Sequence, residues 1–199
     1  MKTKYQELLE NLRKRRFDAQ YFATGDAAAQ YLSREICATT VGFGGSVTLG
    51  ELGLYEMLSR TNTVYWHMID GAEALAKAGT ASVYLSSLNA MTQSGELVNI
   101  DGVGNRVAAT AYGPSRVYFV VGRNKLEETL EQAVWRARNI AAPLNAKRRG
   151  AKTPCTQQEP RCYDCHSAER ICRELLIHWQ KPMHMEKMEI LFVDQDLGY

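Results

Sequence analysis

Four of the five cysteines in this chain lie close together, at Cys155, Cys162, Cys165 and Cys172. The central pair forms a Cys-x-x-Cys turn, which can bring two thiolates to one metal ion. The outer two stand symmetrically, each separated from that pair by six intervening residues. They could complete an all-sulfur set of the kind that zinc and iron–sulfur clusters prefer. The spacing therefore predicts a metal or iron–sulfur site. It matches neither the bacterial ferredoxin run nor a common zinc-ribbon pattern, so it does not identify the metal.

Two other uses of clustered cysteines stay open: a redox or disulfide pair, and purely structural thiols. Stable disulfides need an oxidising compartment, and the charged first thirty residues lack a signal-peptide pattern. We therefore expect a cytoplasmic protein, whose thiols stay reduced unless a metal holds them. His166 adjoins Cys165 and is a spare ligand candidate. Cys37, at the end of a predicted helix, is expected to be a small buried hydrophobic residue.

A glycine-rich turn at Gly44, Gly45 and Ser46 is the second feature with chemical potential. It joins a predicted strand to a predicted helix, where Thr48 and Glu51 fit a capping box. Glycines let a ligand approach the backbone, and free amides at a helix start favour an anion. We predict a small-anion site here; the alternative is a tight turn without a ligand. The sequence is neither a P-loop nor a dinucleotide fingerprint, so it names no nucleotide.

A second polar group follows a predicted strand at 81–86. Its members are Ser86, Ser87, Asn89, Thr92 and Gln93. Ligands of open α/β sheets lie outside the carboxyl ends of the strands, so this group is expected to face the same crevice as the glycine turn. Asn89 or Gln93 would orient a carboxylate or hydroxyl there, unless both serve only to form turns.

Residues 95–107 concentrate charged groups and read as a hairpin around Asp101-Gly102. Arg106 is a candidate to clamp a carboxylate or phosphate with two hydrogen bonds. Asp101 and Glu96 are candidates for acid–base groups, with a solvated hairpin edge as the other interpretation.

The elements that must position these residues alternate between strands and helices. Strands are predicted at 17–22, 39–43, 64–69, 81–86, 117–121 and 189–193. Helices are predicted at 3–16, from Asp26 to Ile36, at 48–59, at 72–78, and over the apolar stripe from Leu126 to Ile140. Residues 117–121 are all apolar, as in a strand buried on both faces. The pattern predicts an α/β fold with a largely parallel sheet flanked by helices.

We expect three segments: an α/β domain over 1–149, a Cys-rich excursion over 150–180, and a strand within 181–199 that returns to the main domain. Within the excursion, Ser167 is expected to cap a helix through Ile171, Leu175 and Trp179.

The charge and hydropathy of the chain favour neither nucleic acid as a partner nor a membrane-spanning helix. The chain has 199 residues, 45% of them hydrophobic, and a formal net charge of +2, which gives no reason to expect nucleic acid. No apolar run approaches the roughly 18 residues that cross a membrane as a helix.

Taken together, these segments resemble the LUD (lactate-utilisation) domain family, and in particular its cysteine-containing branch related to lactate-utilisation protein C. The resemblance covers nearly the whole chain. It rests on the stretches 42–50, 96–106 and 138–147, and on Thr153-Pro154-Cys155, Cys162-Tyr163-Asp164-Cys165 and Arg170-Ile171-Cys172.

The resemblance implies a fold like ribose-5-phosphate isomerase and CoA transferases. It also implies a link to the oxidation of L-lactate to pyruvate, in which relatives work beside iron–sulfur subunits. One hypothesis is thus a redox or electron-transfer protein with an iron–sulfur cluster or zinc on the cysteines and a small anion on the glycine turn. The other is an isomerase- or transferase-type enzyme with Glu51 or Asp101 as base or nucleophile, and a structural metal or none. Iron–sulfur subunits and further copies of this chain remain open as partners.

Overall fold

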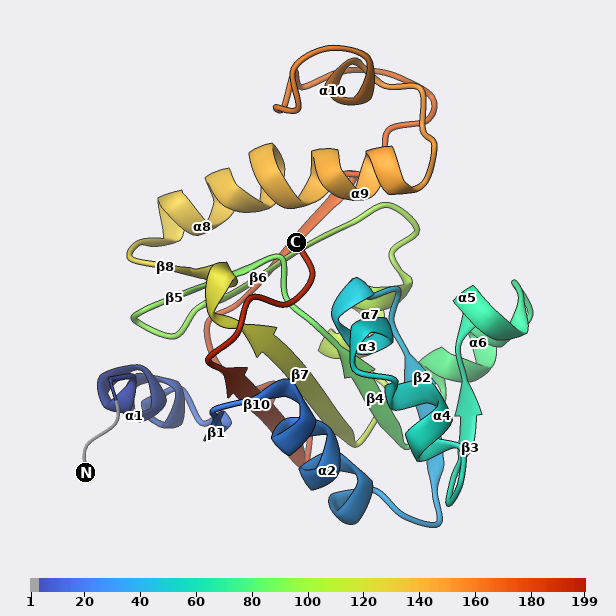
Figure 1. The fold of residues 1–199 in the computed structure, drawn as a ribbon, viewed down its shortest axis with the longest axis vertical. Helices are drawn as coiled ribbons and strands as arrows, with labels where there is room; N and C mark the ends of the chain where they lie inside the picture. The colour runs from blue at the N-terminus through green and yellow to red at the C-terminus, as the bar shows by residue number, and fades with distance from the viewer. Residues whose placement is uncertain (1–3) are drawn as a thin grey trace.

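The computed structural model describes residues 4–199, and its centre is a six-stranded sheet in which all neighbouring strands are parallel (Figure 1). In spatial order the strands are β1 (Asp18–Phe22), β10 (Lys187–Val193), β7 (Arg116–Gly122), β4 (Val83–Ser86), β2 (Thr40–Phe43) and β3 (Thr63–Tyr65). This confirms the predicted α/β fold. The last strand, β10, pairs with both β1 and β7.

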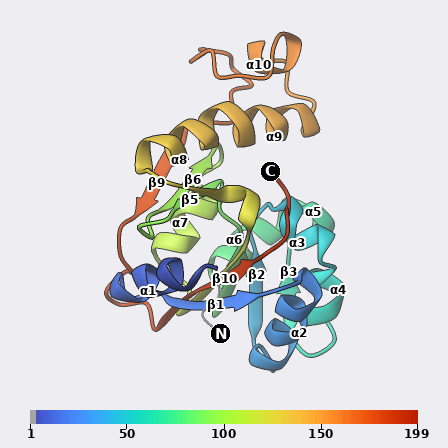
Figure 2. The ribbon, with the colours of Figure 1, turned by 60° about the vertical axis from the view of Figure 1, so that its left-hand side comes forward.

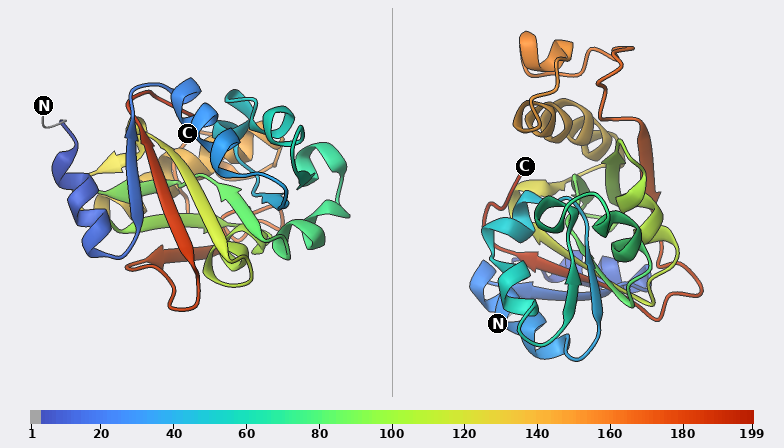
Figure 3. Two further views of the ribbon diagram at one scale, coloured as in Figure 1. Left: turned by 90° about the horizontal axis from the view of Figure 1, so that it is seen from below. Right: turned by 90° about the vertical axis from the view of Figure 1, so that its right-hand side faces the viewer.

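Helices cover both faces of this sheet (Figure 3). The side chains of β7 alternate between two apolar clusters, with Phe119 on one face and Tyr118 on the other. The face of Phe119 packs against α1 (Gln6–Lys14), α6 (Ala74–Gly79) and α7 (Asn105–Ala111). The opposite face packs against α2 (Gly25–Glu35), α3 (Val47–Glu51) and α4 (Leu54–Leu58). The predicted buried strand at 117–121 therefore lies at the centre of two cores.

Local boundaries differ from the sequence expectations on this side of the molecule. Thr24 caps α2, since its hydroxyl accepts from the Ala27 amide at 3.2 Å, and Asp26 lies inside the helix. The helix predicted over 48–59 breaks at Gly53, whose φ of 59° is left-handed. The strand predicted at 64–69 ends at Tyr65, because the chain turns into α5 (His67–Asp70).

A smaller four-stranded sheet lies beside the main one, in the order β8 (Leu126–Glu127), β5 (Ala90–Thr92), β6 (Leu97–Asp101) and β9 (Glu174–His178). A short 3-10 turn, η1 (Arg123–Lys125), leads from β7 into β8. A long helical run packs over this sheet and consists of α8 (Leu130–Arg136), the π-helical η2 (Ala137–Ala141) and α9 (Ala142–Arg148). The helix predicted from Leu126 thus begins later and runs further than its apolar stripe indicated.

Two sequence predictions fail in this sheet. Residues 95–107 are not a hairpin, because β6 ends at Asp101 and α7 begins at Asn105; the antiparallel partners of β6 are β5 and β9. The helix expected after Ser167 is also wrong. Its i, i+4 apolar spacing is real, but Leu175 lies in β9 opposite Ile100, and backbone pairing with β6 determines the conformation.

The cysteine segment stands on the far side of the α8–α9 helix from the main sheet (Figure 2). It leaves α9, forms the single turn α10 (Pro154–Gln157), and runs without regular structure until β9. Over residues 4–199, the structure contains no helix with the length and apolarity needed to cross a membrane.

Candidate functional site: an anion pocket and a cysteine pocket

The glycine turn follows the carboxyl end of β2. Its third residue, Ser46, caps α3 by accepting from the Leu49 amide at 3.3 Å. This corrects the predicted capping box of Thr48 and Glu51. Gly44 lies so close to its neighbours that an added Cβ would stand 2.9 Å from the Ser86 hydroxyl and 3.2 Å from Arg106. Position 44 therefore requires glycine, because the Ser86 and Arg106 side chains occupy the space next to its Cα.

Thr48 and Glu51 instead contact the C-terminal segment. The buried Thr48 hydroxyl is 3.3 Å from the Leu197 carbonyl oxygen, and a Glu51 carboxylate oxygen accepts from the Gly198 amide at 2.8 Å. Glu51 does not line the pocket described below. The segment after β10 thus closes one side of the glycine turn.

Lys125 is the central residue that sequence reasoning missed. It follows β7, is only 3% exposed, and donates to the Thr48 hydroxyl at 3.0 Å and the Ser87 hydroxyl at 2.9 Å. Burial lowers its pKa to about 7, and the positive charges of Arg136 and Arg106 act in the same direction. Its position in the sequence could have identified it. Lys125 comes three residues after the most apolar strand, and the residues that follow such strands lie at the ligand-binding edge of a parallel sheet.

Arg106 lies in the first turn of α7 and points back over the glycine turn. Its guanidinium donates to the Asn89 side-chain oxygen at 3.0 Å and to the Ile100 carbonyl. Desolvation lowers the pKa of Arg106, and the nearby Asp101 carboxylate opposes that shift. Asn89 and Arg106, which the sequence offers as separate ligand-binding candidates, are thus in contact, and polar contacts hold Arg106 in place.

The carboxylates near Arg106 have structural partners. Asp101 accepts from the amides of Gly102, Arg106 and Val107, at 2.8, 2.8 and 3.1 Å, and so caps α7. Glu96 pairs with Arg15 and accepts from the hydroxyls of Thr92 and Ser94, at a distance from the glycine turn.

Around Lys125 the chain forms a small pocket of about 40 Å³ at the carboxyl ends of β2, β4 and β7. Its lining includes Gly45, Ser46, Val47, Thr48, Ser87, Leu88, Asn89, Arg106, Lys125, Asn145, Arg148 and Tyr199. Ser87 and Asn89 thereby face the same crevice as the glycine turn. Three of the lining side chains are basic, and none of the lining residues is Asp or Glu. We refer to this as the anion pocket.

The anion pocket opens into a larger cleft of about 620 Å³, with which it shares Gly45, Asn145, Arg106 and Arg148. Arg149, Arg170 and Arg173 add positive charge to the cleft. His67 lies near Gly45, and burial, with Arg149, lowers its pKa. Gln93 and Thr92 line neither the anion pocket nor the larger cleft.

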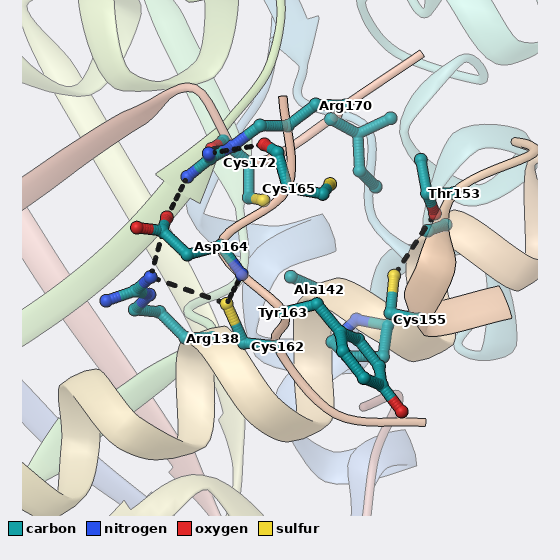
Figure 4. A pocket seen from close by; sticks show the side chains of 13 residues that line it. Arg138, Ala142, Thr153, Cys155, Cys162, Tyr163, Asp164, Cys165, Arg170 and Cys172 are labelled. Carbon is teal, nitrogen blue, oxygen red and sulfur yellow. Dashed lines mark hydrogen bonds and ion pairs between the residues drawn. The ribbon is translucent and has the colours of Figure 1, made fainter. Parts of the chain in front are cut away.

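All four clustered cysteines line a separate pocket, the cysteine pocket, between α9 and the loop before β9 (Figure 4). All four thiols are free and half-buried. Long loops and a short turn thus bring Cys155 and Cys172 to the same pocket as the central pair. Cys37, in contrast, is exposed, which corrects its expected burial: its helix ends at Glu35, and Cys37 lies beyond it. His166 does not line the pocket.

The Cys162–Cys165 turn contains a left-handed residue and a sulfur that accepts two hydrogen bonds. Asp164 has a left-handed φ of 44°, and its amide donates to the Cys162 sulfur at 3.4 Å. Arg138 donates to the same sulfur at 3.4 Å and to the Asp164 carboxylate at 3.1 Å. Such donors stabilise a thiolate, so the surroundings fit the chemistry of a sulfur-ligated metal.

The outer cysteines are held differently. Cys155 lies within the single turn α10, with its sulfur 3.1 Å from the Thr153 hydroxyl. Burial raises the pKa of Cys172, and the Arg170 guanidinium opposes that shift. Within residues 4–199, no three His, Cys, Asp or Glu side chains are arranged as a group that could hold a metal ion. The donor types fit a metal, but the described arrangement of sulfurs is more open than a ligand set.

The cysteine pocket and the larger, basic cleft share Arg170 and Ile171 in their linings. Arg170 donates to the carbonyls of Cys165 and Cys172 at 2.8 and 2.9 Å and to Asp164 at 3.1 Å, yet it also lines the basic cleft. Ile171 packs so closely on Gly102 that a Cβ there would stand 2.4 Å from the Ile171 carbonyl oxygen. The cysteine loop is therefore docked directly beside the residues that cap α7 and position Arg106.

Comparison with known proteins gives one family and one fold. A family model described as the LUD domain matches residues 5–193. A crystal structure of a DUF162 family protein from Deinococcus radiodurans superposes with a TM-score of 0.54, at 12% sequence identity, over 96% of this chain and 99% of that one. The search of curated proteins gave no significant match.

Proposed function

This chain belongs to the LUD domain family, and from that premise we propose that it binds a small anion, such as a carboxylate, in the anion pocket and serves small-carboxylate redox metabolism. The four cysteines would supply a second centre, a zinc site or an iron–sulfur cluster of an electron-transfer protein. The proposal includes membership of the cysteine-containing branch of this family, which is related to lactate-utilisation protein C.

The observation that carries the proposal is the charge of the anion pocket. The Arg106 and Arg148 guanidinium groups line the pocket with the Lys125 amine beside a turn of glycine and serine, and the lining contains no Asp or Glu side chain. A bound carboxylate or phosphate would receive charge-assisted hydrogen bonds in a partly dehydrated space, where such bonds are strong.

The cysteine pocket supports a metal through its donors and not through a preformed ligand set. The Cys162 sulfur accepts from an amide and a guanidinium, the Cys155 thiol is in hydrogen-bond contact with a hydroxyl, and the Cys-x-x-Cys turn has a left-handed residue. Metal binding would then require the outer thiols to close on the central pair, which a loop without regular structure permits.

The isomerase or transferase alternative receives less support from the described contacts. It needs a carboxylate free to act as base or nucleophile in the crevice. Asp101 uses its oxygens to cap α7, and Glu51 accepts from Gly198 outside the anion pocket.

Titration calorimetry with L-lactate, phosphate and sulfate tests the anion pocket. Replacing Arg106 with Gln removes a charged donor and should weaken binding about 10- to 100-fold, as expected for a hydrogen bond to a charged group. Arg60→Gln, an exposed change at the opposite end of β2, is the control and should leave affinity unchanged. Equal binding by both variants would refute the assignment.

Anaerobic reconstitution with iron and sulfide, or with zinc, tests the cysteine pocket. Metal and sulfide analysis and visible absorption would identify the centre. Cys162→Ser and Cys165→Ser should abolish uptake, whereas Cys37→Ser, which removes the exposed fifth thiol, should not. A reduced wild-type chain that takes up neither iron nor zinc would remove the metal from the proposal.

A further inference from the structure

Lys125 has the surroundings of a nucleophilic amine. A neutral amine carries two N–H groups and one lone pair. Its nitrogen donates to the hydroxyls of Thr48 and Ser87, which uses both N–H groups of the neutral form. Among the residues that the structure describes, no carboxylate lies within ion-pair distance of this nitrogen.

The position of Lys125 is unusual for a lysine whose only role is to attract an anion. Such a lysine generally remains hydrated and charged, because burying an ammonium without a counter-ion is costly. Lys125 is 3% exposed; desolvation and the positive Arg136 and Arg106 lower its pKa, and the Glu51 carboxylate, which accepts from the Gly198 amide, opposes that shift. Desolvation combined with neighbouring cations is the arrangement that keeps a lysine neutral and reactive near neutral pH.

We propose that Lys125 forms an imine with a small carbonyl compound that carries an anionic group, such as a 2-oxo acid. The inference rests on the anion site proposed above. Arg106 and Arg148 would receive the carboxylate, and the carbonyl carbon would then face the nitrogen that lines the same pocket. The volume of about 40 Å³ limits the portion of ligand beside Lys125 to a few atoms.

The step balances without another reactant. The nitrogen lone pair bonds to the carbonyl carbon, the carbonyl π electrons move to oxygen, and one N–H proton follows to give a carbinolamine. The carbon–oxygen bond then breaks, and the oxygen leaves as water with the second N–H proton. The hydroxyls of Thr48 and Ser87, each in hydrogen-bond contact with the nitrogen, lie where these protons must pass.

Reductive trapping tests the proposal. The full chain is incubated with glyoxylate or pyruvate and sodium cyanoborohydride, and the adduct is located by peptide mass spectrometry. We expect one adduct per chain, on Lys125, formed faster as the pH rises through about 7. Acetaldehyde, a carbonyl without a carboxylate, should react more slowly, and L-lactate, a carboxylate without a carbonyl, should compete.

Two variants and a parallel measurement make the result decisive. Lys125→Arg should lose the adduct, while Lys147→Arg, at an exposed lysine of α9, should retain it. Peptide mapping of the wild-type chain gives the answer even if Lys125→Arg folds poorly. Lactate binding without trapping at Lys125 overturns the imine and leaves the anion site in place. Adducts only at other lysines also overturn it, and absence of both binding and trapping overturns both proposals.

Discussion

Lys125 and the four clustered cysteines illustrate two ways of building a polar site. The partners of Lys125 are 77 and 38 residues away in sequence, and each is fixed at the edge of the main sheet. The cysteines lie within one short stretch, are half-buried, and sit in a loop held mainly by Arg138, Asp164 and Arg170. The Lys125 site is therefore part of the core, whereas the cysteine site lies in a loop at the surface of the protein.

This difference indicates where stability comes from in each pocket. The anion pocket inherits its shape from strands whose side chains are buried on both faces, so it needs no ligand to stay formed. The cysteine pocket has few buried apolar contacts and several exposed ion pairs, each worth little in water. Its order is therefore expected to depend on what the thiols bind.

Removal of metal should have the largest effect and act on one pocket only. After reconstitution, a chelator should reduce amide-exchange protection over residues 150–173 by orders of magnitude, while β7 and β10 stay protected. Hydrogen exchange with mass spectrometry measures both regions in one experiment. Loss of protection in the main sheet as well would mean that the two pockets are one folding unit.

Acid should weaken the core site through Lys125. Its folded pKa of about 7 lies below the usual 10.5, so between these values the unfolded chain holds a proton that the folded chain does not. Stability should therefore rise with pH across this window, by up to about 1.4 kcal/mol per unit, and the full penalty applies below pH 7.

Comparison with Lys125→Met isolates that contribution. Denaturant unfolding from pH 7 to 10 should show wild type gaining stability relative to this variant as pH rises. Exposed Lys147→Met is the matched control, for which the difference should stay flat. Parallel curves for wild type and Lys125→Met would contradict the burial of an uncompensated ammonium.

The contact between the two regions can be broken at Gly102. A methyl group there would meet the Ile171 backbone at 2.4 Å, so Gly102→Ala should cost about 1–3 kcal/mol and loosen the cysteine loop. Gly79→Ala has no neighbour within 4 Å and should be neutral or slightly stabilising. Thermal unfolding and exchange over 165–173 measure the effect; equal behaviour of both variants would show that the docking is not tight.

The smallest effect is expected from Asp164→Asn. Asparagine tolerates the left-handed backbone, so the change removes only the carboxylate that pairs with Arg138 and Arg170. The carboxylate is largely exposed, and the loss should stay below about 1 kcal/mol and shrink further in high salt. A larger loss, measured by denaturation, would mean that the cysteine pocket is held by charge more than its exposure indicates.

Strong local patterns predicted much of the fold. The five apolar residues from Val117 to Val121 specify a strand buried on both faces, because no other short element hides every side chain. The same sequence places Arg106, Asn89 and the glycine turn as candidates, and the structure brings them to one crevice. Their positions after predicted strands were enough to group these residues, because the carboxyl ends of parallel strands lie at the same edge of a sheet.

Local patterns failed where a distant strand determined the conformation. Leu175 and its neighbours have helical spacing, but the free hydrogen-bonding edge of β6 recruits them as β9. Asp101-Gly102 resembles a hairpin turn, yet its carboxylate caps the following helix. In both cases the sequence specified the local options, and a partner far away in the chain selected one.

By itself the sequence determined the α/β alternation, the glycine turn, and the density of thiols, because each depends on residues near one another in the chain. Only the tertiary structure decided that Lys125 is buried without a carboxylate partner, and that the cysteine loop forms a wall of the basic cleft. Burial and charge environment arise from contacts between distant segments, and these change the chemistry of a lysine that in sequence looks like any other.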